Sequence, residues 1–402
     1  MDESKSRELP IVKSPVFCAL PWVHLCGSVD GVWGRCCVDS SMYYDDYYKM
    51  EKEPEVKLRP DTLGCLPGSH YSITNPEKTL NLVEAFNSPA MRETRVAMMK
   101  GERVAACQYC YDREDGGGTS YRQIANQMFR DKVDWASLTE NTAVDGSLNE
   151  FPCYLDIRFG NTCNLECIMC GFPISSRWGR RVPLKWMPAK IDPYASDREL
   201  WRMLEDNAPK LRRIYFAGGE PFLQPLHFKL IDMLIDRNCA AQVDLGYNTN
   251  LTILPRGIFE KLGKFKSVDI GASCDGTGKV FESIRVGAKW NTFIKNVRET
   301  KKHFPVRLAV TPQRDNIANL DELIRWGIEE GCEIDLTNIL MHPAELSLTN
   351  LSDAEKKVFA NKYTALAFSY KQSGYQTIGD SLVSIVRFLN TSNQSETSEN
   401  CS

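Results

Sequence analysis

Three cysteines lie within eight residues of one another in the stretch NTCNLECIMCG, residues 161–171. Cys163, Cys167 and Cys170 are separated by three and then by two residues, and this stretch holds no fourth cysteine. A structural zinc site takes four ligands, usually as two well-separated pairs. Three thiolates in one tight loop instead fit a [4Fe–4S] cluster in which one iron lacks a protein ligand. That iron would be open to a substrate or a cofactor.

The elements that must position this loop follow a strand–helix alternation that begins near residue 152. Strands are predicted at 154–159, 212–217, 242–247, 267–274, 306–313 and 333–339, and helices at 196–207, 225–237, 256–263, 288–303 and 319–330. Ser196 with Glu199 is spaced as a capping box, and Ser352 with Glu355 is spaced as another for a C-terminal helix of about 20 residues. The alternation predicts parallel βα units, hence an α/β sheet or barrel.

The predicted strands place apolar and polar residues on opposite faces. In the strand at 267–274 one face carries Val268, Ile270, Ala272 and Cys274. We expect helices to cover the apolar faces, which leaves a polar inner face, whereas a closed barrel fills its interior with branched apolar residues. Six such strands predict a partial (β/α)6 TIM-like barrel that holds something polar. A two-sided sheet with one solvated face is the alternative. Cys274 would point toward the helices, as a structural thiol rather than a hydrogen-atom donor.

The cysteine spacing after the first predicted strand resembles that of the radical S-adenosylmethionine (SAM) enzymes. The resemblance continues in AGGEP (217–221), YNTN (247–250) and SCDG (273–276), at the ends of the next predicted strands, and covers residues 152–340. It implies a [4Fe–4S] cluster held by Cys163, Cys167 and Cys170. It also implies SAM contacts from Gly218, Gly219, Glu220, Pro221, Asn248, Ser273, Asp275 and Arg285. Met169 departs from the family pattern, which usually has an aromatic residue before the last cysteine.

The resemblance implies a reaction as well. One electron from the reduced cluster would cleave SAM to methionine and a 5′-deoxyadenosyl radical, which would remove a hydrogen atom from a substrate. The electron would come from a flavodoxin- or ferredoxin-type donor. The protein would position the substrate and exclude water. No catalytic residue is identified from the sequence.

A second group of cysteines precedes the predicted barrel. Cys18, Cys36 and the pair Cys107-x2-Cys110 resemble the auxiliary-cluster module of SPASM/twitch radical SAM enzymes, which implies an auxiliary [4Fe–4S] cluster; Cys37 is an alternative to Cys36. In the best-known members this module follows the barrel, whereas here it comes first. A structural zinc site using the same four thiolates is the alternative.

Composition limits the classes of protein to consider. The chain has 402 residues, a net charge of −3 and a pI near 6.1, and this balance points to neither nucleic acid nor an anionic membrane. The N-terminus MDESKSRELP has no hydrophobic run, and no long apolar stretch follows, so we expect no secretion signal, no membrane span and a cytoplasmic location. The expected organisation is an auxiliary-cluster domain (1–130), a linker (131–150), the barrel (151–345), a C-terminal helical segment (346–390) and a disordered tail (391–402).

Three functions remain open from the sequence. The first is a radical SAM enzyme that modifies a ribosomally made peptide or protein, because auxiliary-cluster members often do so. The second is a radical SAM dehydrogenase or epimerase of a small metabolite. The third is a non-catalytic protein that binds an iron–sulfur cluster or zinc for structural reasons.

Overall fold

A nine-stranded sheet organises the computed structural model, which describes residues 14–39, 61–67, 69, 72, 76–171, 174–181 and 189–391. Its strand order is β3-β2-β1-β4-β5-β6-β7-β8-β9. The last six strands pair in chain order and in parallel. They are β4 (Tyr154–Ile157), β5 (Arg213–Phe216), β6 (Asp244–Thr249), β7 (Ser267–Ser273), β8 (Val306–Ala309) and β9 (Glu333–Asp335). Each overlaps a strand predicted from the sequence, which confirms the α/β fold with a partial barrel.

The N-terminal residues extend the same sheet. Strand β1 (His24–Gly27) pairs in parallel with β4, and β2 (Val32–Gly34) and β3 (Gly64–Cys65) follow it in antiparallel pairs. Strands from before and after the expected linker at 131–150 therefore pair in one sheet. The linker itself contains α7 (Trp135–Glu140), and Trp135 is buried. The domain boundaries read from the sequence remain a prediction.

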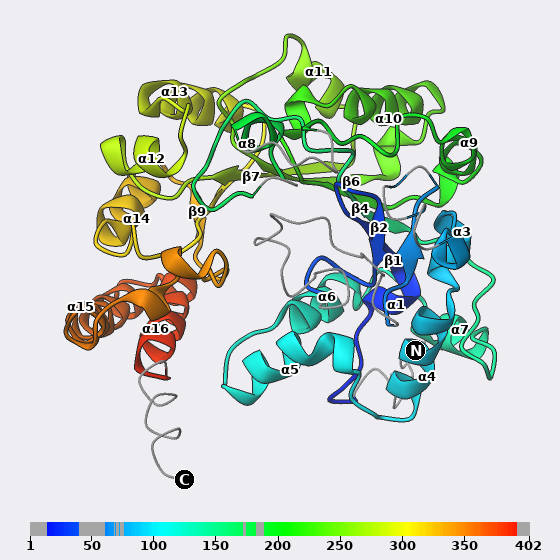
Figure 1. Cartoon of the computed structure of the whole chain (residues 1–402), viewed down its shortest axis with the longest axis horizontal. Coiled ribbons are helices and arrows are strands. Elements are labelled where there is room, and N and C mark those ends of the chain that lie inside the picture. Colours follow the sequence, from blue (N-terminus) through cyan, green and yellow to red (C-terminus); the bar gives the residue numbers. More distant parts are fainter. Residues whose placement is uncertain are drawn as a thin grey trace, which may run out of the picture.

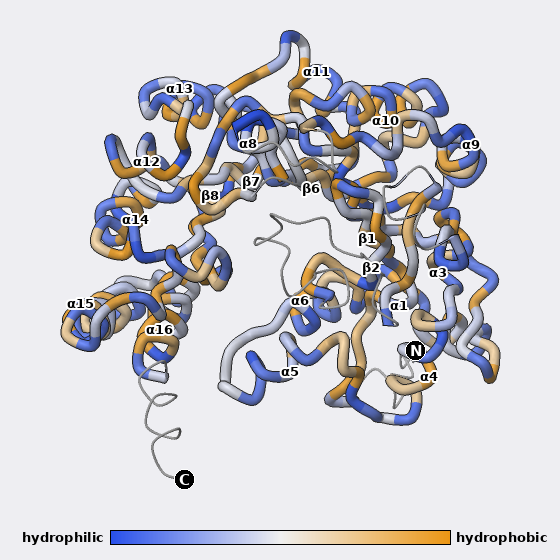
Figure 2. The backbone as a smooth tube through the Cα atoms, in the orientation of Figure 1, coloured by the Kyte–Doolittle hydropathy of each residue, from blue (hydrophilic) through white to orange (hydrophobic). Residues whose placement is uncertain are grey.

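Helices cover the outer side of the parallel strands (Figure 1). Figure 2 shows hydrophilic residues on the outer side of α10 and α13. The helices of this layer are α8 (Ser176–Arg181), α9 (Arg198–Asp206), α10 (Pro225–Asp236), α11 (Ile258–Leu262), α12 (Gly278–Ile284), α13 (Trp290–Lys301) and α14 (Leu320–Glu329). The capping box predicted at Ser196 is wrong, because Asp197 caps α9 by accepting the N–H of Leu200 at 2.9 Å. This start buries Leu200 and Leu204 on one side of α9.

The remaining helices lie at the two ends of the sheet (Figure 1). The N-terminal ones are α1 (Leu20–Val23), α3 (Leu82–Phe86), α4 (Pro89–Met99), α5 (Gln108–Asp115) and α6 (Tyr121–Phe129). Beyond β9, α15 (Asp353–Gln372) starts at the predicted Ser352–Glu355 capping box, which is confirmed. A second helix, α16 (Gln376–Thr391), packs against α15, so the C-terminal segment holds two helices where one was expected. The predicted disordered tail lies outside the described residues, apart from residue 391.

Within the described residues, no helix combines the length and the apolar character that crossing a membrane requires.

The two faces of the parallel sheet differ as the alternation predicts. Ile270, Leu308 and Ile334 are buried on the face toward the helices. On the opposite face Arg307 of β8 lies 2.9 Å from Asp335 of β9 and 3.6 Å from Asp269 of β7. Asp156 and Arg158 form another pair at 3.2 Å. The polar inner face is thus stabilised by ion pairs within and between its strands.

Two buried histidines predict an acid-sensitive fold. His24 of β1 and His227 of α10 are fully buried, and burial lowers the pKa of each to about 3. Histidine in the unfolded chain has a pKa near 6.5, so the unfolded state binds more protons between these values and stability falls as the pH drops below about 6.5. At about 1.4 kcal/mol per pKa unit, each histidine should cost about 2 kcal/mol of unfolding free energy at pH 5.

Urea unfolding at pH 7 and pH 5 measures this loss. His227→Gln should remove about half of the pH dependence, since one of two equal contributions is lost. His303→Gln, at an exposed histidine after α13, should leave it unchanged. Equal losses of stability in the wild type and in His227→Gln would contradict the prediction.

Candidate functional site

The three-cysteine loop begins a few residues after β4 and is tied to a distant part of the chain. The N–H groups of Glu166 and Ile168 donate to the carbonyls of Val286 and Ile284, each at 2.9 Å. The Cys163 N–H donates to the Ser176 hydroxyl at 3.2 Å. Parallel βα units place such loops at the carboxyl edge of the sheet, where α/β proteins bind ligands. The loop is therefore held in one conformation by the turn after α12 and by α8.

The thiols of this loop are close to one another. Cys167 is buried, and Cys163 and Cys170 are half-buried. A hydrogen bond with Cys170 lowers the pKa of Cys167 and raises that of Cys170, while burial raises the pKa of Cys163 to about 11. Two of the three sulfurs are thus in direct contact.

The three thiols of the loop match the donor set of a [4Fe–4S] cluster with one open iron. In the described part of the chain, no group of three or more His, Cys, Asp or Glu side chains converges as the ligands of one metal ion would. Zinc needs its sulfur ligands about 2.3 Å from a single point. A [4Fe–4S] cluster takes one thiolate per iron and spreads its ligands further apart. Three thiols on one short loop can supply one thiolate to each of three irons of such a cluster.

The AGGEP segment after β5 runs against the cysteine loop. The Glu220 N–H donates to the carbonyl of Thr162 at 2.8 Å. Gly218 and Gly219 have φ of 72° and 43°, which side chains rarely allow. A Cβ on Gly219 would lie 2.5 Å from the Thr162 oxygen, and one on Gly218 would lie 2.7 Å from the Arg158 Cβ. Gly219 is needed because two backbones meet here, and Gly218 because the side chains of Val29 and Arg158 lie against it.

The Glu220 carboxylate is buried, and its hydrogen-bond donors among the described residues are uncharged. Thr249 donates its hydroxyl to Oε1 at 2.7 Å, Asn250 its N–H to Oε2 at 2.7 Å, and Phe222 its N–H to Oε1 at 3.0 Å. Burial raises the pKa of Glu220 despite these bonds. Pro221 opens the short 3-10 turn that follows. A buried acid with neutral donors suits a ligand that brings its own positive charge.

The other predicted SAM contacts lie at the ends of β6 and β7. The Asn248 Oδ1 is buried and has no hydrogen-bond partner among the described residues. Such an acceptor fits a ligand that donates an N–H or O–H. Ser273 is the last residue of β7 and is half-buried. Asp275 and Arg285 form a buried ion pair at 2.6 Å, so Arg285 already has a carboxylate partner within the protein.

Asn250 is a residue of this site that the sequence reasoning missed. Its Nδ2 lies 3.9 Å from the Cys163 sulfur. Arg285 places Nη1 at the same distance from the Cys167 sulfur. The sequence feature that could have indicated Asn250 is its place in YNTN, two residues after Asn248. Side chains two residues apart on a strand point to the same face, so Asn250 would be expected on the same face as Asn248.

Residues 157–327 match the model of the Radical SAM superfamily. We refer to this segment as the radical SAM domain, after the model that it matches. A search of the curated proteins found no match.

Solved structures also resemble parts of the chain. "Native anSMEcpe with bound AdoMet" is 17% identical with a TM-score of 0.41, covering 55% of this chain and 62% of its own. "Streptococcus suis SuiB bound to S-adenosylmethionine" is 15% identical with a TM-score of 0.38, covering 71% and 62%. "TYW1 with a lysine-pyruvate adduct bound" is 15% identical with a TM-score of 0.31, covering 51% and 70%. The chain thus spans less than two thirds of the length of the first two.

Outside the radical SAM domain, the four predicted N-terminal cysteines lie near enough to one another for their charges to affect one another's pKa. Burial raises the pKa of Cys18, and the nearby Cys107 and Cys110 raise it further. Burial also raises the pKa of Cys36, and the adjacent Cys37, then Asp39, Cys107 and Cys18, raise it further. For Cys37, burial raises the pKa to about 12, and the charges that act on it are those of Asp156 in β4 and of Arg158 just after β4. The charges of Cys18 and Cys107 thus act on Cys36, whereas those of Asp156 and Arg158 act on Cys37.

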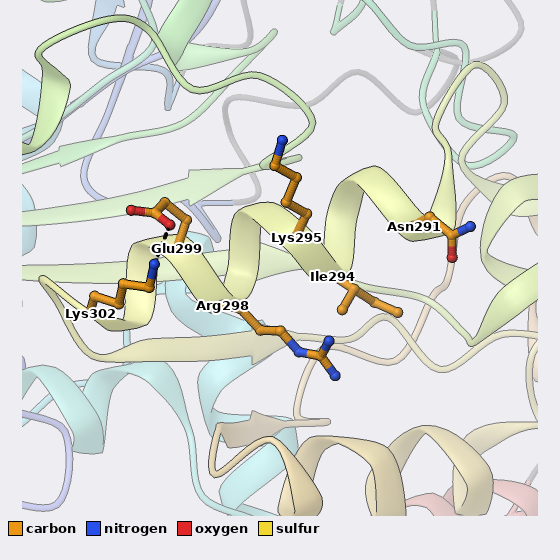
Figure 3. A pocket seen from close by; sticks show the side chains of 6 residues that line it. All are labelled: Asn291, Ile294, Lys295, Arg298, Glu299 and Lys302. Atoms are coloured by element: carbon orange, nitrogen blue, oxygen red, sulfur yellow. Dashed lines mark hydrogen bonds and ion pairs between the residues drawn. The ribbon is translucent and has the colours of Figure 1, made fainter.

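A hollow on the outside of the molecule has no part in this site. It runs along the surface of α13, and the side chains that line it come from that helix and from Lys302, the residue that follows it (Figure 3). They are Asn291, Ile294, Lys295, Arg298, Glu299 and Lys302. None belongs to the cysteine loops or to the edge of the sheet that the radical SAM domain uses.

Proposed function

We propose that this protein is a radical SAM enzyme that modifies a ribosomally made peptide or protein by removing a hydrogen atom from it. The observation that carries the proposal is the meeting of the three-cysteine loop, the buried Glu220 and the orphaned Asn248 oxygen at one edge of the sheet, inside a segment that matches the superfamily model. The N-terminal cysteine group supports a peptide substrate, since auxiliary-cluster members of the resembled family often act on peptides.

The residues divide the work as follows. Cys163, Cys167 and Cys170 would hold the cluster, and Glu220 would receive the ammonium of SAM. Gly218, Gly219 and Pro221 shape the backbone there, and Asn248, Ser273, Asp275 and Arg285 complete the edge. With SAM bound, a reduced [4Fe–4S] cluster supplies the electron that releases a hydrogen-abstracting radical. The polar inner face would orient the substrate and exclude bulk water.

We also propose an auxiliary [4Fe–4S] cluster at Cys18, Cys36, Cys107 and Cys110. The gathering of these four thiols supports it. Arg122 lies close enough to Cys18 for the two charges to interact, and a cation there would offset part of the negative charge of four thiolates. The electron for the first cluster would come from a flavodoxin- or ferredoxin-type protein.

Anaerobic reconstitution followed by metal analysis and a 5′-deoxyadenosine assay tests the proposal. Two clusters predict about eight irons per chain. Four irons with one zinc would refute the auxiliary cluster, and reduced, loaded protein that leaves SAM intact would refute the enzymatic function.

A deuterium-transfer experiment with deuterated peptides and deuterated small molecules distinguishes the two substrate classes. Deuterium should enter 5′-deoxyadenosine from a deuterated peptide digest; transfer from the small-molecule fraction alone would indicate a metabolite enzyme.

The N-terminal cysteines give a paired prediction. Cys36→Ala should lower the iron content by about half, because a four-thiolate cluster loses one of its ligands. Cys37→Ala, one residue away, should keep the wild-type iron content. Iron analysis and the absorbance of the reconstituted proteins measure both. A loss of iron in Cys37→Ala alone would reverse the assignment of the ligand.

A further inference from the structure

Asn250 joins two parts of the candidate site. Its backbone N–H donates to Glu220 Oε2 at 2.7 Å. Its side-chain Nδ2 donates to Asn164 Oδ1 at 2.9 Å and lies 3.9 Å from the Cys163 sulfur, within hydrogen-bond range of a sulfur acceptor. Asn250 is buried, at 6% exposed. One residue thus contacts both the proposed cofactor acid and a proposed cluster ligand.

The hydrogen bonds of the turn decide which end of the Asn250 amide faces the sulfur. Its Oδ1 accepts from the N–H of Thr252 at 2.9 Å and from the Thr252 hydroxyl at 2.6 Å. A flipped amide would set its NH2 group against the Thr252 N–H and its oxygen against the Asn164 oxygen. Asn164 in turn donates Nδ2 to the Thr252 hydroxyl at 2.9 Å, which closes the network. The N–H end of Asn250 is therefore directed at Cys163.

The backbone beside Asn250 is strained. Leu251 has φ of 50°, a left-handed conformation that is uncommon outside glycine, and its side chain is fully buried. Its N–H donates to the Thr249 hydroxyl at 3.0 Å and its carbonyl accepts from Asn296 of α13 at 2.9 Å. These bonds hold the turn in a conformation that keeps the Asn250 amide toward the sulfur.

We propose that Asn250 is a positioning residue that sets the reduction potential of the cluster through an N–H···S hydrogen bond to Cys163. This inference rests on the proposed function, because it needs a cluster at that cysteine. A hydrogen bond to a cluster sulfur stabilises the reduced, more negative form and so raises the potential. In a poorly solvated loop such a bond is stronger than in water.

Asn250→Asp provides the sharpest test, since it keeps the shape of the side chain and replaces the donor by a negatively charged oxygen. The reduced cluster should become harder to form. We expect at least a tenfold lower ratio of reduced to oxidised cluster at a fixed potential, which corresponds to about 59 mV for a one-electron couple. An EPR-monitored redox titration of the anaerobically reconstituted protein measures the shift.

Asn296→Asp is the matched control. It makes the same chemical change at a residue that holds the same turn but does not contact the sulfur, and it should keep the wild-type potential. SAM affinity is a second readout. The backbone N–H of Asn250 still reaches Glu220 in the variant, so binding should stay within a few-fold of the wild type while the potential shifts.

The outcomes separate this inference from the proposed function. Wild-type protein that takes up no iron would refute the function itself. Loaded wild type and Asn250→Asp with the same potential would overturn the role of Asn250 and leave the function standing. Equal shifts in Asn250→Asp and Asn296→Asp would also overturn it, because they would indicate general disturbance of the turn. Should Asn250→Asp fail to take up iron, Asn250→Ala must show a lowered potential, and an unchanged one would refute the inference.

Discussion

Cys163→Ala should abolish SAM cleavage. The substitution leaves two thiolates on the loop, and a site that needs three cannot retain a [4Fe–4S] cluster with one open iron. We expect the rate of 5′-deoxyadenosine formation to fall by at least about a thousandfold, or ~4 kcal/mol of activation free energy. Iron content and the visible absorbance of the reconstituted protein should fall with it. The half-buried position of Cys163 makes a folding defect a minor contribution.

Cys332→Ala is the control for this change. Cys332 is a buried cysteine that follows α14, where its N–H donates to the carbonyl of Gly327, and it belongs to neither cysteine group. This variant should keep the iron content and the SAM cleavage of the wild type. If Cys163→Ala cleaved SAM as the wild type does, the assignment of the three-cysteine loop would be wrong.

Asp275→Asn should destabilise the fold by about 3–5 kcal/mol, because it leaves Arg285 as a buried cation without its partner. The two side chains lie 2.6 Å apart and are almost fully buried. Asparagine still accepts the N–H of Thr311, which Asp275 accepts at 2.8 Å, so the change isolates the charge. Urea unfolding of the metal-free protein at pH 7 measures the loss.

A double replacement tests the reason for that loss. Burial raises the pKa of Asp275 even with Arg285 beside it, so the carboxylate is costly to keep charged, while the negative charge of Asp275 keeps the pKa of Arg285 above its ordinary value against the effect of burial. Asp275→Leu combined with Arg285→Met should therefore recover most of the lost stability. Glu299→Gln breaks the exposed pair with Lys302 in Figure 3 and should change the stability by less than about 1 kcal/mol. A double variant as unstable as Asp275→Asn would refute the desolvation argument.

Local patterns in the sequence were sufficient for most of the radical SAM domain. Alternation over six to eight residues located the strands β4 to β9, since the side-chain period of two is a property of each strand alone. Helix ends were less certain: the cap of α9 is Asp197 rather than Ser196, because either residue type can cap and burial of Leu200 decides between them. The helix α16 was not predicted separately, because the segment 346–390 was expected only to contain a C-terminal helix.

Long-range contacts account for what the sequence did not predict. Strand β1 pairs with β4, which lies more than a hundred residues later in the chain. The local sequence of neither strand indicates which strand it pairs with. The choice between Cys36 and Cys37 depends on which thiol turns toward Cys18 and Cys107, and adjacent residues of the same type look alike in a sequence. Asn250 reaches Cys163 from a different strand, so its role could not be read from its neighbours in the chain.

The sequence by itself therefore determined the chemistry: three thiolates on one loop, a GGEP turn and the order of the parallel strands are all encoded within short segments. Only the tertiary structure brings residues from distant segments to this site. The Asn250 amide, the Asp275–Arg285 pair and the orientation of Cys36 each depend on contacts between segments far apart in the chain. Such contacts arise when the sheet assembles and buries polar groups that must then find partners.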